Sequence, residues 1–184
     1  MFRLNELTTI NDVKKYCDTH FTLIGSGTSR YVYDIGNNTI IKVPQNERGI
    51  WQNESEIHLY RENSCNPLLL PLENKGDNCL WVSYKKVNLI NEENKHLFKE
   101  YHDVHFHELR GLIMDINFKL KKKEIIYSKS NNTFIRSIED FLINNKILFV
   151  HDLFDLKNWG YINNQIYLID YGMNNDTYKK YIIR

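Results

Sequence analysis

The chain has 184 residues, which is enough for one sizeable hydrophobic core or for two small lobes that share a cleft. A hydrophobic fraction of 42% and an aromatic fraction of 13% are typical of folded proteins and exclude a wholly disordered chain. The net charge of +1 gives no general attraction to nucleic acid or to an anionic membrane, and no segment approaches the ~18 consecutive apolar residues of a membrane span.

The three cysteines, Cys17, Cys65 and Cys79, form no CxxC pair. An odd number of widely spaced cysteines is typical of reduced thiols in a cytosol, so we expect no disulfide. The N-terminal residues also lack the apolar run of a secretory signal. Together these features predict a soluble, cytoplasmic protein that has neither a membrane nor a nucleic acid as its partner.

The first half of the sequence is predicted to contain two helices among several strands. Thr9 followed by Asp12 resembles a helix-capping box, and apolar residues then recur at helical spacing, which predicts a helix over residues 9–18. The Gly-Asn-Asn at 36–38 is typical of a hairpin turn between two strands. A second helical pattern covers 48–63. Antiparallel strands are expected at residues 21–24, 31–35, 39–43, 67–72 and 79–87.

The second half is predicted to be mainly helical. Apolar residues at helical spacing indicate one or two helices over 92–118 and another over 132–145, which opens at Asn131 or Asn132. The segment 151–172 then indicates a loop, a short strand pair and a second loop. We expect a single α+β domain with two lobes. These are a five-stranded antiparallel N-lobe with one helix packed on its sheet, over about residues 1–87, and a reduced, mainly helical C-lobe over about residues 88–184.

Two features of the expected N-lobe are typical of phosphate binding. Gly25 and Gly27 lie between two predicted strands, where the lack of a Cβ lets the backbone approach a phosphate closely, although glycines also form plain hairpin turns. Lys42 follows in a hydrophobic strand, which is a costly place for a charge that has no anionic partner. Glu56 on the next helix is the expected partner, with Glu54 as the alternative.

The segment from His151 to Gly172 carries three polar residues on two loops. Asp152, Asn158 and Asp170 are set among apolar residues that would fix their backbone. Two carboxylates and a carboxamide are groups that hold Mg²⁺ and direct a hydroxyl group toward a phosphate. The residues therefore predict a site for phosphate chemistry, although aspartates also form turns.

In this order and at these intervals, the motifs resemble those of the protein-kinase-like superfamily over about residues 21–172. Gly25-x-Gly27-x-x-Arg30-x-Val32 is similar to the glycine-rich loop, with Arg30 in the place of its third glycine. Ile40-Ile41-Lys42 is similar to the strand that carries the phosphate-binding lysine. Glu56 is similar to the glutamate that pairs with this lysine from the following helix.

The later motifs follow the order of the family as well. Leu80–Val87, which includes Tyr84, is placed like the strand and hinge that hold the adenine. His151-Asp152-Leu153 followed by Asn158 is similar to the catalytic loop, and Asp170-Tyr171-Gly172 to the metal-binding Asp-Phe-Gly.

The resemblance implies a bilobal kinase-like fold that uses ATP and Mg²⁺. Lys42 would hold the phosphates, Asn158 and Asp170 the Mg²⁺, and Asp152 would orient the attacking hydroxyl or accept its proton. The implied nucleotide site consists of Gly25, Gly27, Val32, Lys42, Glu56 and Tyr84.

The chain departs from the family pattern at two places. Asp152 and Asn158 are six positions apart where the family usually has five, so Asp155 is a rival for the catalytic carboxylate. Only twelve residues (184 − 172) follow Gly172, which is too few for an activation segment and for the helices that bind a protein substrate. We therefore expect a truncated C-lobe, as in small kinase-like proteins of phages and low-GC bacteria. The absence of alanine and the abundance of Asn, Ile, Lys and Tyr favour the same source.

The function favoured by these features is that of an ATP-dependent phosphotransferase. It would be a minimal Ser/Thr protein kinase, with a protein substrate or a host protein as its partner in a bacterial or infected-host cytosol. The alternative is a pseudokinase, which senses a nucleotide or binds a protein without turnover. A small-molecule phosphotransferase is less favoured, because a short C-lobe leaves little material for a substrate pocket.

Two further clusters have simpler interpretations. The series His102-x-x-His105-x-His107-Glu108 suggests zinc, but His107 would point away from the other two histidines, so a solvated helix is favoured. The basic run at 119–123 follows a predicted helix and suits the negative end of its dipole better than it suits a nucleic acid.

Overall fold

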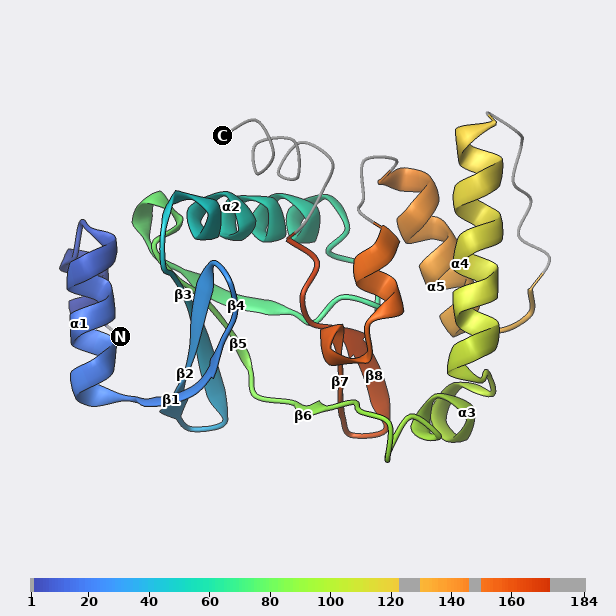
Figure 1. The fold of residues 1–184 in the computed structure, drawn as a ribbon, viewed down its shortest axis with the longest axis horizontal. Coiled ribbons are helices and arrows are strands. Elements are labelled where there is room, and N and C mark those ends of the chain that lie inside the picture. The colour runs from blue at the N-terminus through green and yellow to red at the C-terminus, as the bar shows by residue number, and fades with distance from the viewer. Residues whose placement is uncertain (1, 123–129, 146–149, 173–184) are drawn as a thin grey trace.

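The computed structural model describes residues 2–122, 130–145 and 150–172, and within these ranges the strands form two separate antiparallel sheets (Figure 1). The five-stranded sheet has the order β1-β2-β3-β5-β4, and the three-stranded sheet has the order β6-β7-β8. Each sheet belongs to one half of the molecule, so the predicted α+β fold with two lobes is confirmed. Across the same ranges, no helix combines the length and the apolar character that crossing a membrane requires.

The five-stranded sheet contains four of the five strands expected from the first half of the sequence. The hairpin between β2 and β3 turns at Gly36, Asn37 and Asn38, which all have positive φ angles of 82°, 50° and 58°. Glycine and asparagine tolerate this left-handed backbone best, which explains why this tripeptide predicted the turn correctly. The strands are β1 (Thr22–Ser26), β2 (Arg30–Gly36), β3 (Thr39–Pro44), β4 (Leu72–Lys75) and β5 (Val82–Lys85).

Helix α2 (Glu47–Glu62) lies across the five-stranded sheet (Figure 1). It begins at Asn46, whose side chain accepts a hydrogen bond from the Gly49 backbone N–H at 3.3 Å. A Cβ on Gly49 would lie 2.3 Å from the Ser29 carbonyl oxygen, so only glycine lets the helix approach the loop before β2 this closely. The helix buries polar side chains as well as apolar ones, which is unusual for a helix that only covers a core.

The N-terminal segment packs on the outer part of the same sheet. Helix α1 (Ile10–His20) begins at Thr9, whose hydroxyl oxygen accepts a hydrogen bond from the Asp12 N–H at 3.2 Å, as the sequence predicted. Val13 and Cys17 of this helix are fully buried against β-strand side chains. Cys17, Cys65 and Cys79 are all unpaired, so the prediction of free thiols is confirmed. The chain before α1 is the short 3₁₀ helix η1 (Phe2–Glu6).

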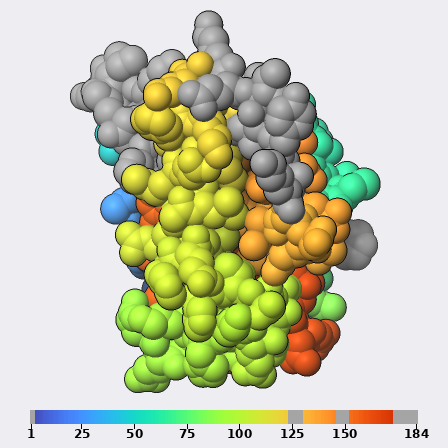
Figure 2. Space-filling model, turned by 90° about the vertical axis from the view of Figure 1, so that its right-hand side faces the viewer, coloured from blue at the N-terminus to red at the C-terminus, as the bar shows by residue number. Residues whose placement is uncertain are grey.

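The other half packs helices around the small sheet. Phe98, Phe134 and Trp159 form the aromatic centre of its core, with the Phe98 and Trp159 ring centroids 5.4 Å apart. Helices α4 and α5 lie side by side on one face of the molecule (Figure 2). The elements are β6 (Asn88–Leu89), α3 (Leu97–His102), α4 (Phe106–Lys121), α5 (Thr133–Asn144), β7 (Trp159–Ile162) and β8 (Gln165–Leu168). The sequence indicated one or two helices over 92–118, and the structure has two, while α5 opens at Asn132, one of the two expected positions.

One strand prediction was wrong. The apolar run at 67–72 was expected as a strand of the N-lobe, but the fourth strand of that sheet begins only at Leu72. Leu68 and Leu70 instead exchange backbone hydrogen bonds with Leu168 of β8, at 2.8 and 3.1 Å. Its three central residues, Leu68, Leu69 and Leu70, are buried, and they connect the two halves.

Some expectations lie outside what the structure tests. The predicted boundary near residue 87 stays a prediction, although β5 ends at Lys85 and β6 begins at Asn88. The residues after Gly172, and with them the expected truncation of the C-lobe, lie outside the described residues, as does Lys123 of the basic run.

Candidate functional site

Lys42 and Glu56 form a buried ion pair between β3 and α2. The Lys42 Nζ lies 2.9 and 3.1 Å from the two carboxylate oxygens of Glu56. Lys42 is 7% exposed and Glu56 is fully buried, whereas Glu54 is exposed. The pairing predicted from the sequence is therefore present, and Glu56 is the partner in place of Glu54.

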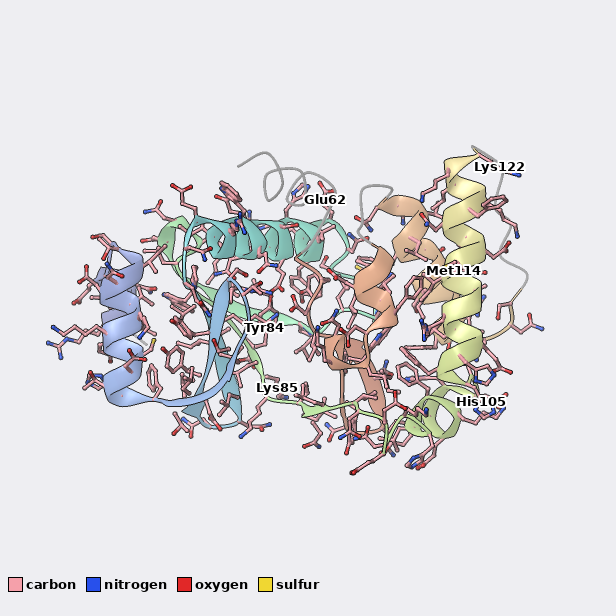
Figure 3. All side chains as sticks on the ribbon, in the orientation of Figure 1. Glu62, Tyr84, Lys85, His105, Met114 and Lys122 are labelled. Atoms are coloured by element: carbon pink, nitrogen blue, oxygen red, sulfur yellow. The ribbon has the colours of Figure 1, made fainter. Side chains whose placement is uncertain are left out.

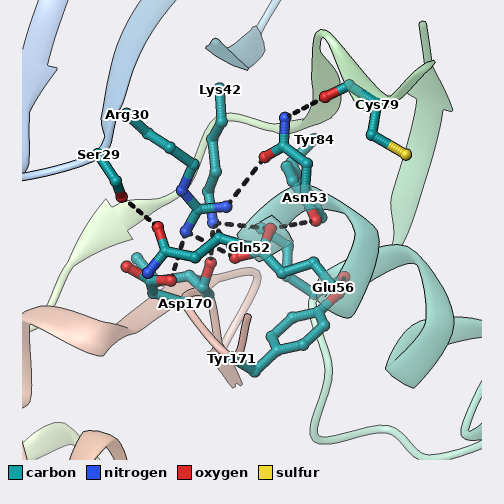
Figure 4. Close-up of polar contacts among 12 residues, drawn as sticks. Ser29, Arg30, Lys42, Gln52, Asn53, Glu56, Cys79, Tyr84, Asp170 and Tyr171 are labelled. Carbon is teal, nitrogen blue, oxygen red and sulfur yellow. Dashed lines mark hydrogen bonds and ion pairs between the residues drawn. The ribbon is translucent and has the colours of Figure 1, made fainter. Parts of the chain in front are cut away.

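Arg30 joins this ion pair from the start of β2 (Figure 4). Its Nη2 donates hydrogen bonds to Glu56 Oε1 at 2.9 Å and to Asp170 Oδ1 at 2.6 Å. Its Nη1 donates to Asn53 Oδ1 at 3.1 Å. The sequence identified Arg30 only as a substitute for a glycine, so its central position was missed. The one available signal was a charged residue between a glycine-rich turn and a hydrophobic strand.

Arg30, Lys42, Glu56 and Asp170 make up what we call the charge cluster. Burial opposes the ionisation of Glu56, but Arg30 and Lys42 outweigh it and lower the pKa of that carboxyl to about 2. Burial alone would lower the pKa of Arg30. The carboxylates of Glu56 and Asp170 outweigh burial, so the pKa of Arg30 is raised above its usual value. With two cations against two carboxylates, the cluster keeps its members charged although most of them are removed from water.

Tyr84 lies behind the charge cluster. Its hydroxyl donates a hydrogen bond to Glu56 Oε2 at 2.6 Å, and the Lys42 Nζ lies 4.9 Å from the centre of its ring. Burial, followed by the nearby Glu56 charge, raises the pKa of Tyr84 well above its usual value. The side chain therefore supports Glu56 and Lys42 from the interior of the sheet. Its expected place beside an adenine stays a prediction.

The glycine-rich turn is held in place by side chains from α2 and from the connection between β3 and α2. Gly27 N–H donates to the Arg30 carbonyl oxygen at 2.9 Å, which closes the turn between β1 and β2. The side-chain amide of Gln45 donates to the carbonyl oxygens of Gly27 and Arg30 at 2.9 and 3.1 Å. Ser29 also donates a hydrogen bond to Gln52 of α2. Gln45 and Gln52 were not singled out from the sequence, since a glutamine carries no local motif.

Gly25 and Val32 are paired across the turn. The two residues are partners in the β1–β2 register, and Val32 is also the β2 partner of Lys42. A Cβ on Gly25 would lie 3.7 Å from the Val32 Cβ, an ordinary contact distance. The predicted nucleotide residues of the N-lobe thus lie next to one another, from Gly25 through Val32 to Lys42.

The predicted residues of the second half are linked to Lys42 by the backbone. The Lys42 Nζ donates to the Ile169 carbonyl oxygen at 2.7 Å, directly before Asp170. The Ile169 N–H in turn donates to the Asn158 carbonyl oxygen at 2.8 Å. Gly172 passes under α2, where a Cβ would lie 2.6 Å from the Gln52 carbonyl oxygen. Asn158 and Ile169 are therefore hydrogen-bonded at the base of the β7–β8 hairpin, and Asp170 comes directly after Ile169.

The six positions from Asp152 to Asn158 are wound into two short 3₁₀ helices. These are η3 (Val150–Phe154) and η4 (Leu156–Asn158). Their tight winding brings the Asn158 side-chain amide to the Asp152 carbonyl oxygen, to which it donates at 2.8 Å. The long spacing therefore does not separate the two residues.

Asp152 and Asp155 have different surroundings. Asp155 caps η4 by accepting from the Lys157 N–H at 3.2 Å, and it forms an ion pair with the Lys157 Nζ at 2.7 Å. Among the described residues, the Asp152 carboxylate accepts no hydrogen bond. Burial, followed by the like charge of Asp170, raises the pKa of Asp152 to about 7. Asp155 therefore caps the turn, whereas the Asp152 carboxyl makes no such contact; the choice between the two as the catalytic carboxylate stays a prediction.

The oxygen atoms of Asn158 and Asp170 suit Mg²⁺ better than a metal that needs a full protein cage. No group of three or more metal-ligating side chains occurs in the described part of the chain. Mg²⁺ is commonly bound through one or two carboxylates, with water and phosphate oxygens as its other ligands. Asp170, with a side chain that is 45% exposed, fits this pattern if Arg30 releases it.

His102, the first histidine of the series, has a structural role. His102 Nε2 accepts a hydrogen bond from the Ile166 N–H at 3.2 Å, and its ring stacks on Phe134 at 4.0 Å. Burial lowers the pKa of His102, so the neutral ring is favoured. The zinc interpretation therefore has no support at this position.

Comparison with known proteins adds a likeness of fold. No protein-family model and no curated protein sequence matches the chain. Among solved structures, the ADP-bound aminoglycoside phosphotransferase APH(2'')-Ib is 16% identical, with a TM-score of 0.46 over 91% of this chain and 72% of that one. The gentamicin complex of APH(2'')-IIa is 17% identical, with a TM-score of 0.47 over 93% of this chain and 74% of that one. At such identities the likeness carries no activity over to this chain.

Proposed function

We propose that the chain is an ATP-dependent phosphotransferase that binds its nucleotide between the two halves, next to the charge cluster. The observation that carries the proposal is the contact of the Lys42 Nζ with both Glu56, at 2.9 Å, and the Ile169 carbonyl oxygen, at 2.7 Å. This contact brings a phosphate-binding cation against the segment that bears Asp170. An ion-paired lysine beside a metal-binding aspartate is the arrangement that phosphoryl transfer by kinases requires.

Each predicted residue has a role in this proposal. Lys42 binds phosphate oxygens and is aligned by Glu56 and Tyr84. Gly25, Gly27 and Val32, on β1, β2 and the turn between them, cover the nucleotide. Asn158 and Asp170 hold Mg²⁺, which neutralises charge on the phosphates when bound. Asp152 accepts the proton of the attacking hydroxyl group, a role for which a pKa of about 7 is well suited.

The acceptor predicted from the sequence is a Ser or Thr hydroxyl group of a protein, and this stays a prediction. A small-molecule acceptor, as in the aminoglycoside phosphotransferases to which the fold is similar, is the other possibility. A cavity that is lined by Asp155, Leu156 and Lys157 favours the small molecule.

The test measures ATP binding and turnover in the same protein. Mg-ATP is expected to raise the melting temperature, because a ligand that binds only the folded state stabilises it. ADP release is expected in the wild type and to be lost in Lys42→Met and in Asp170→Asn. Lys85→Met on β5 is the matched control, because Lys85 is exposed on the same sheet. If millimolar Mg-ATP leaves the melting temperature unchanged, the proposal is wrong.

A second candidate function is a nucleotide-binding module without turnover. The Arg30–Asp170 contact of 2.6 Å favours it, because a carboxylate held by an arginine is not free for a metal. Under this candidate, the wild type binds ATP equally well with and without Mg²⁺ and releases no ADP. Arg30→Gln would then gain Mg²⁺-dependent binding. Under the first candidate, binding by the wild type already depends on Mg²⁺, because Arg30 turns from Asp170 to the phosphates.

A further inference from the structure

A cavity of about 860 Å³ is lined in part by the segment that connects Asp152 to Asn158, and no residue of the charge cluster lines it. Its wall combines the segment before α3, the first turns of α4 and the residues from Phe154 to Lys157. His105, at the start of α4, marks one side of it (Figure 3). Cavities that bind small molecules measure roughly 300–1,000 Å³, so this volume suits a small ligand.

The charged side chains that line the cavity leave one cation without a carboxylate. Lys95 pairs with Glu92 at 2.6 Å, and Lys157 pairs with Asp155 at 2.7 Å. The remaining cation is Arg110, whose guanidinium lies 5.6 Å from the centre of the Phe154 ring. The three cations and two carboxylates of the wall therefore sum to a charge of +1 (3 − 2), which is carried by Arg110.

Three histidines belong to the same wall, and two of them can donate hydrogen bonds to a ligand. His96, His105 and His107 all line the cavity, and the rings of His105 and His107 stack with their centroids 5.4 Å apart. His96 Nδ1 donates to the Glu93 carbonyl oxygen at 3.2 Å, so the donors that face a ligand come from His105, His107 and Arg110. An arginine fork binds a carboxylate or a phosphate through two parallel hydrogen bonds. The ligand that matches this wall is an anion.

The cavity and the proposed catalytic carboxyl share one segment of the chain. Asp155, Leu156 and Lys157 line the cavity, and they connect Asp152 to Asn158 through η3 and η4. The hydrogen bond from the Asn158 side chain to the Asp152 carbonyl oxygen ties the two ends of this segment together. A ligand in the cavity therefore contacts the loop that positions Asp152.

We propose that this cavity binds the phosphate acceptor, and that the acceptor is a small molecule that carries a hydroxyl group together with a carboxylate or phosphate group. The inference rests on the proposed phosphotransferase function. Arg110 and the two donor histidines hold the anionic group, which leaves the hydroxyl group to be directed toward Asp152. The hydroxyl oxygen forms a bond to the γ-phosphorus of ATP, and the bond from that phosphorus to the β,γ-bridging oxygen breaks. The hydroxyl proton passes to Asp152, and ADP leaves.

Binding is tested first without nucleotide, so that the result does not depend on phosphate transfer. Calorimetry with glycerol 3-phosphate and with glycerate is compared with neutral glycerol and with cationic ethanolamine. The two anions are expected to bind, and Arg110→Gln is expected to weaken their binding by about tenfold or more. Arg136→Gln on α5 is the matched control, because Arg136 is an exposed arginine outside the cavity.

Transfer is tested next by ADP release with Mg-ATP in the presence of each compound. Acceleration by an anionic compound in the wild type and in Arg136→Gln, but not in Arg110→Gln, supports the inference. Mg-ATP binding without any binding of the anions overturns it and leaves the proposed function standing. Anion binding without ATP turnover overturns the acceptor role and the proposed function together. Transfer to an acidic serine peptide, with no effect of the small anions, overturns the assignment to a small molecule.

Discussion

The Arg30 guanidinium lies 2.6 Å from a carboxylate oxygen of Asp170, although 140 positions separate the two residues in the chain. The same nitrogen also binds Glu56, so one arginine joins the turn before β2, helix α2 and the segment after β8. Arg30 lies where the glycine-rich pattern expected from the sequence would have its last glycine, and it makes an electrostatic contact between the two halves. Whether Asp170 is available to a metal therefore depends on Arg30.

Arg30→Gln is expected to destabilise the folded protein by about 3 kcal/mol, because it leaves buried carboxylate charge with less compensation. Urea unfolding followed by circular dichroism measures the loss. Arg136→Gln, an exposed change on α5, is expected to stay within about 0.5 kcal/mol of the wild type. Equal stability of the two variants would show that the cluster contributes no stability through Arg30.

Asp152→Asn is expected to change how stability depends on pH. The pKa of Asp152 is raised from 3.8 to about 7 in the folded state, so between these values the unfolded chain has lost a proton that the folded chain retains. This group therefore makes the wild type less stable as the pH rises through this window, and the effect is complete above about pH 7.

Asparagine has no proton to lose at this position. The variant is thus expected to be more stable than the wild type by roughly 2 kcal/mol above the window, a value discounted for partial exposure, and to match it below the window. Melting temperatures across this pH range provide the measurement. A difference between the two proteins that stays constant with pH contradicts the raised pKa.

Gly172→Ala and Gly111→Ala are expected to have opposite effects. A Cβ at position 172 would lie 2.6 Å from the Gln52 carbonyl oxygen and 3.0 Å from the Glu56 Cγ, so α2 or the Asp170 segment must shift. A loss of about 1–3 kcal/mol is expected, together with weaker ATP binding.

Gly111 lies within α4, where a Cβ would meet no atom within 4 Å. Alanine is expected to stabilise that helix by about 1 kcal/mol. Thermal unfolding of the two variants side by side measures both effects, and a Gly172→Ala protein as stable as the wild type would rule out the tight passage under α2.

Tyr84→Phe is expected to cost about 2 kcal/mol, because it removes a buried hydrogen bond of 2.6 Å to the charged Glu56. Urea unfolding gives the value. The matched control is Tyr31→Phe on β2, whose hydroxyl group makes no hydrogen bond within the described residues. Similar stabilities for the two variants would mean that Tyr84 supports Glu56 only by packing.

Helix caps and hairpin turns were predicted well, because each is determined by a few neighbouring residues. Thr9 and Asp12 marked the start of α1, the asparagines after Gly36 marked a hairpin, and Asn132 marked the start of α5. The run at 67–72 was misassigned because an apolar strand looks the same whichever sheet it joins. Its hydrogen bonds to Leu168 depend on a segment about a hundred residues away, which no local pattern encodes.

The sequence by itself determined the α+β order of elements and the positions of Lys42, Glu56, Asp152, Asn158 and Asp170 along the chain. It did so because hydrophobic periodicity and residue type are properties of short segments. Only the tertiary structure decided the charge cluster, since the partners of a buried charge are chosen by three-dimensional packing. Glu56 was selected over Glu54 by burial, and the hydrogen bonds of η4 give Asp155 a partner that Asp152 lacks among the described residues. Arg30 acquired its role because a buried guanidinium must find carboxylates, and the fold brings Glu56 and Asp170 within its reach.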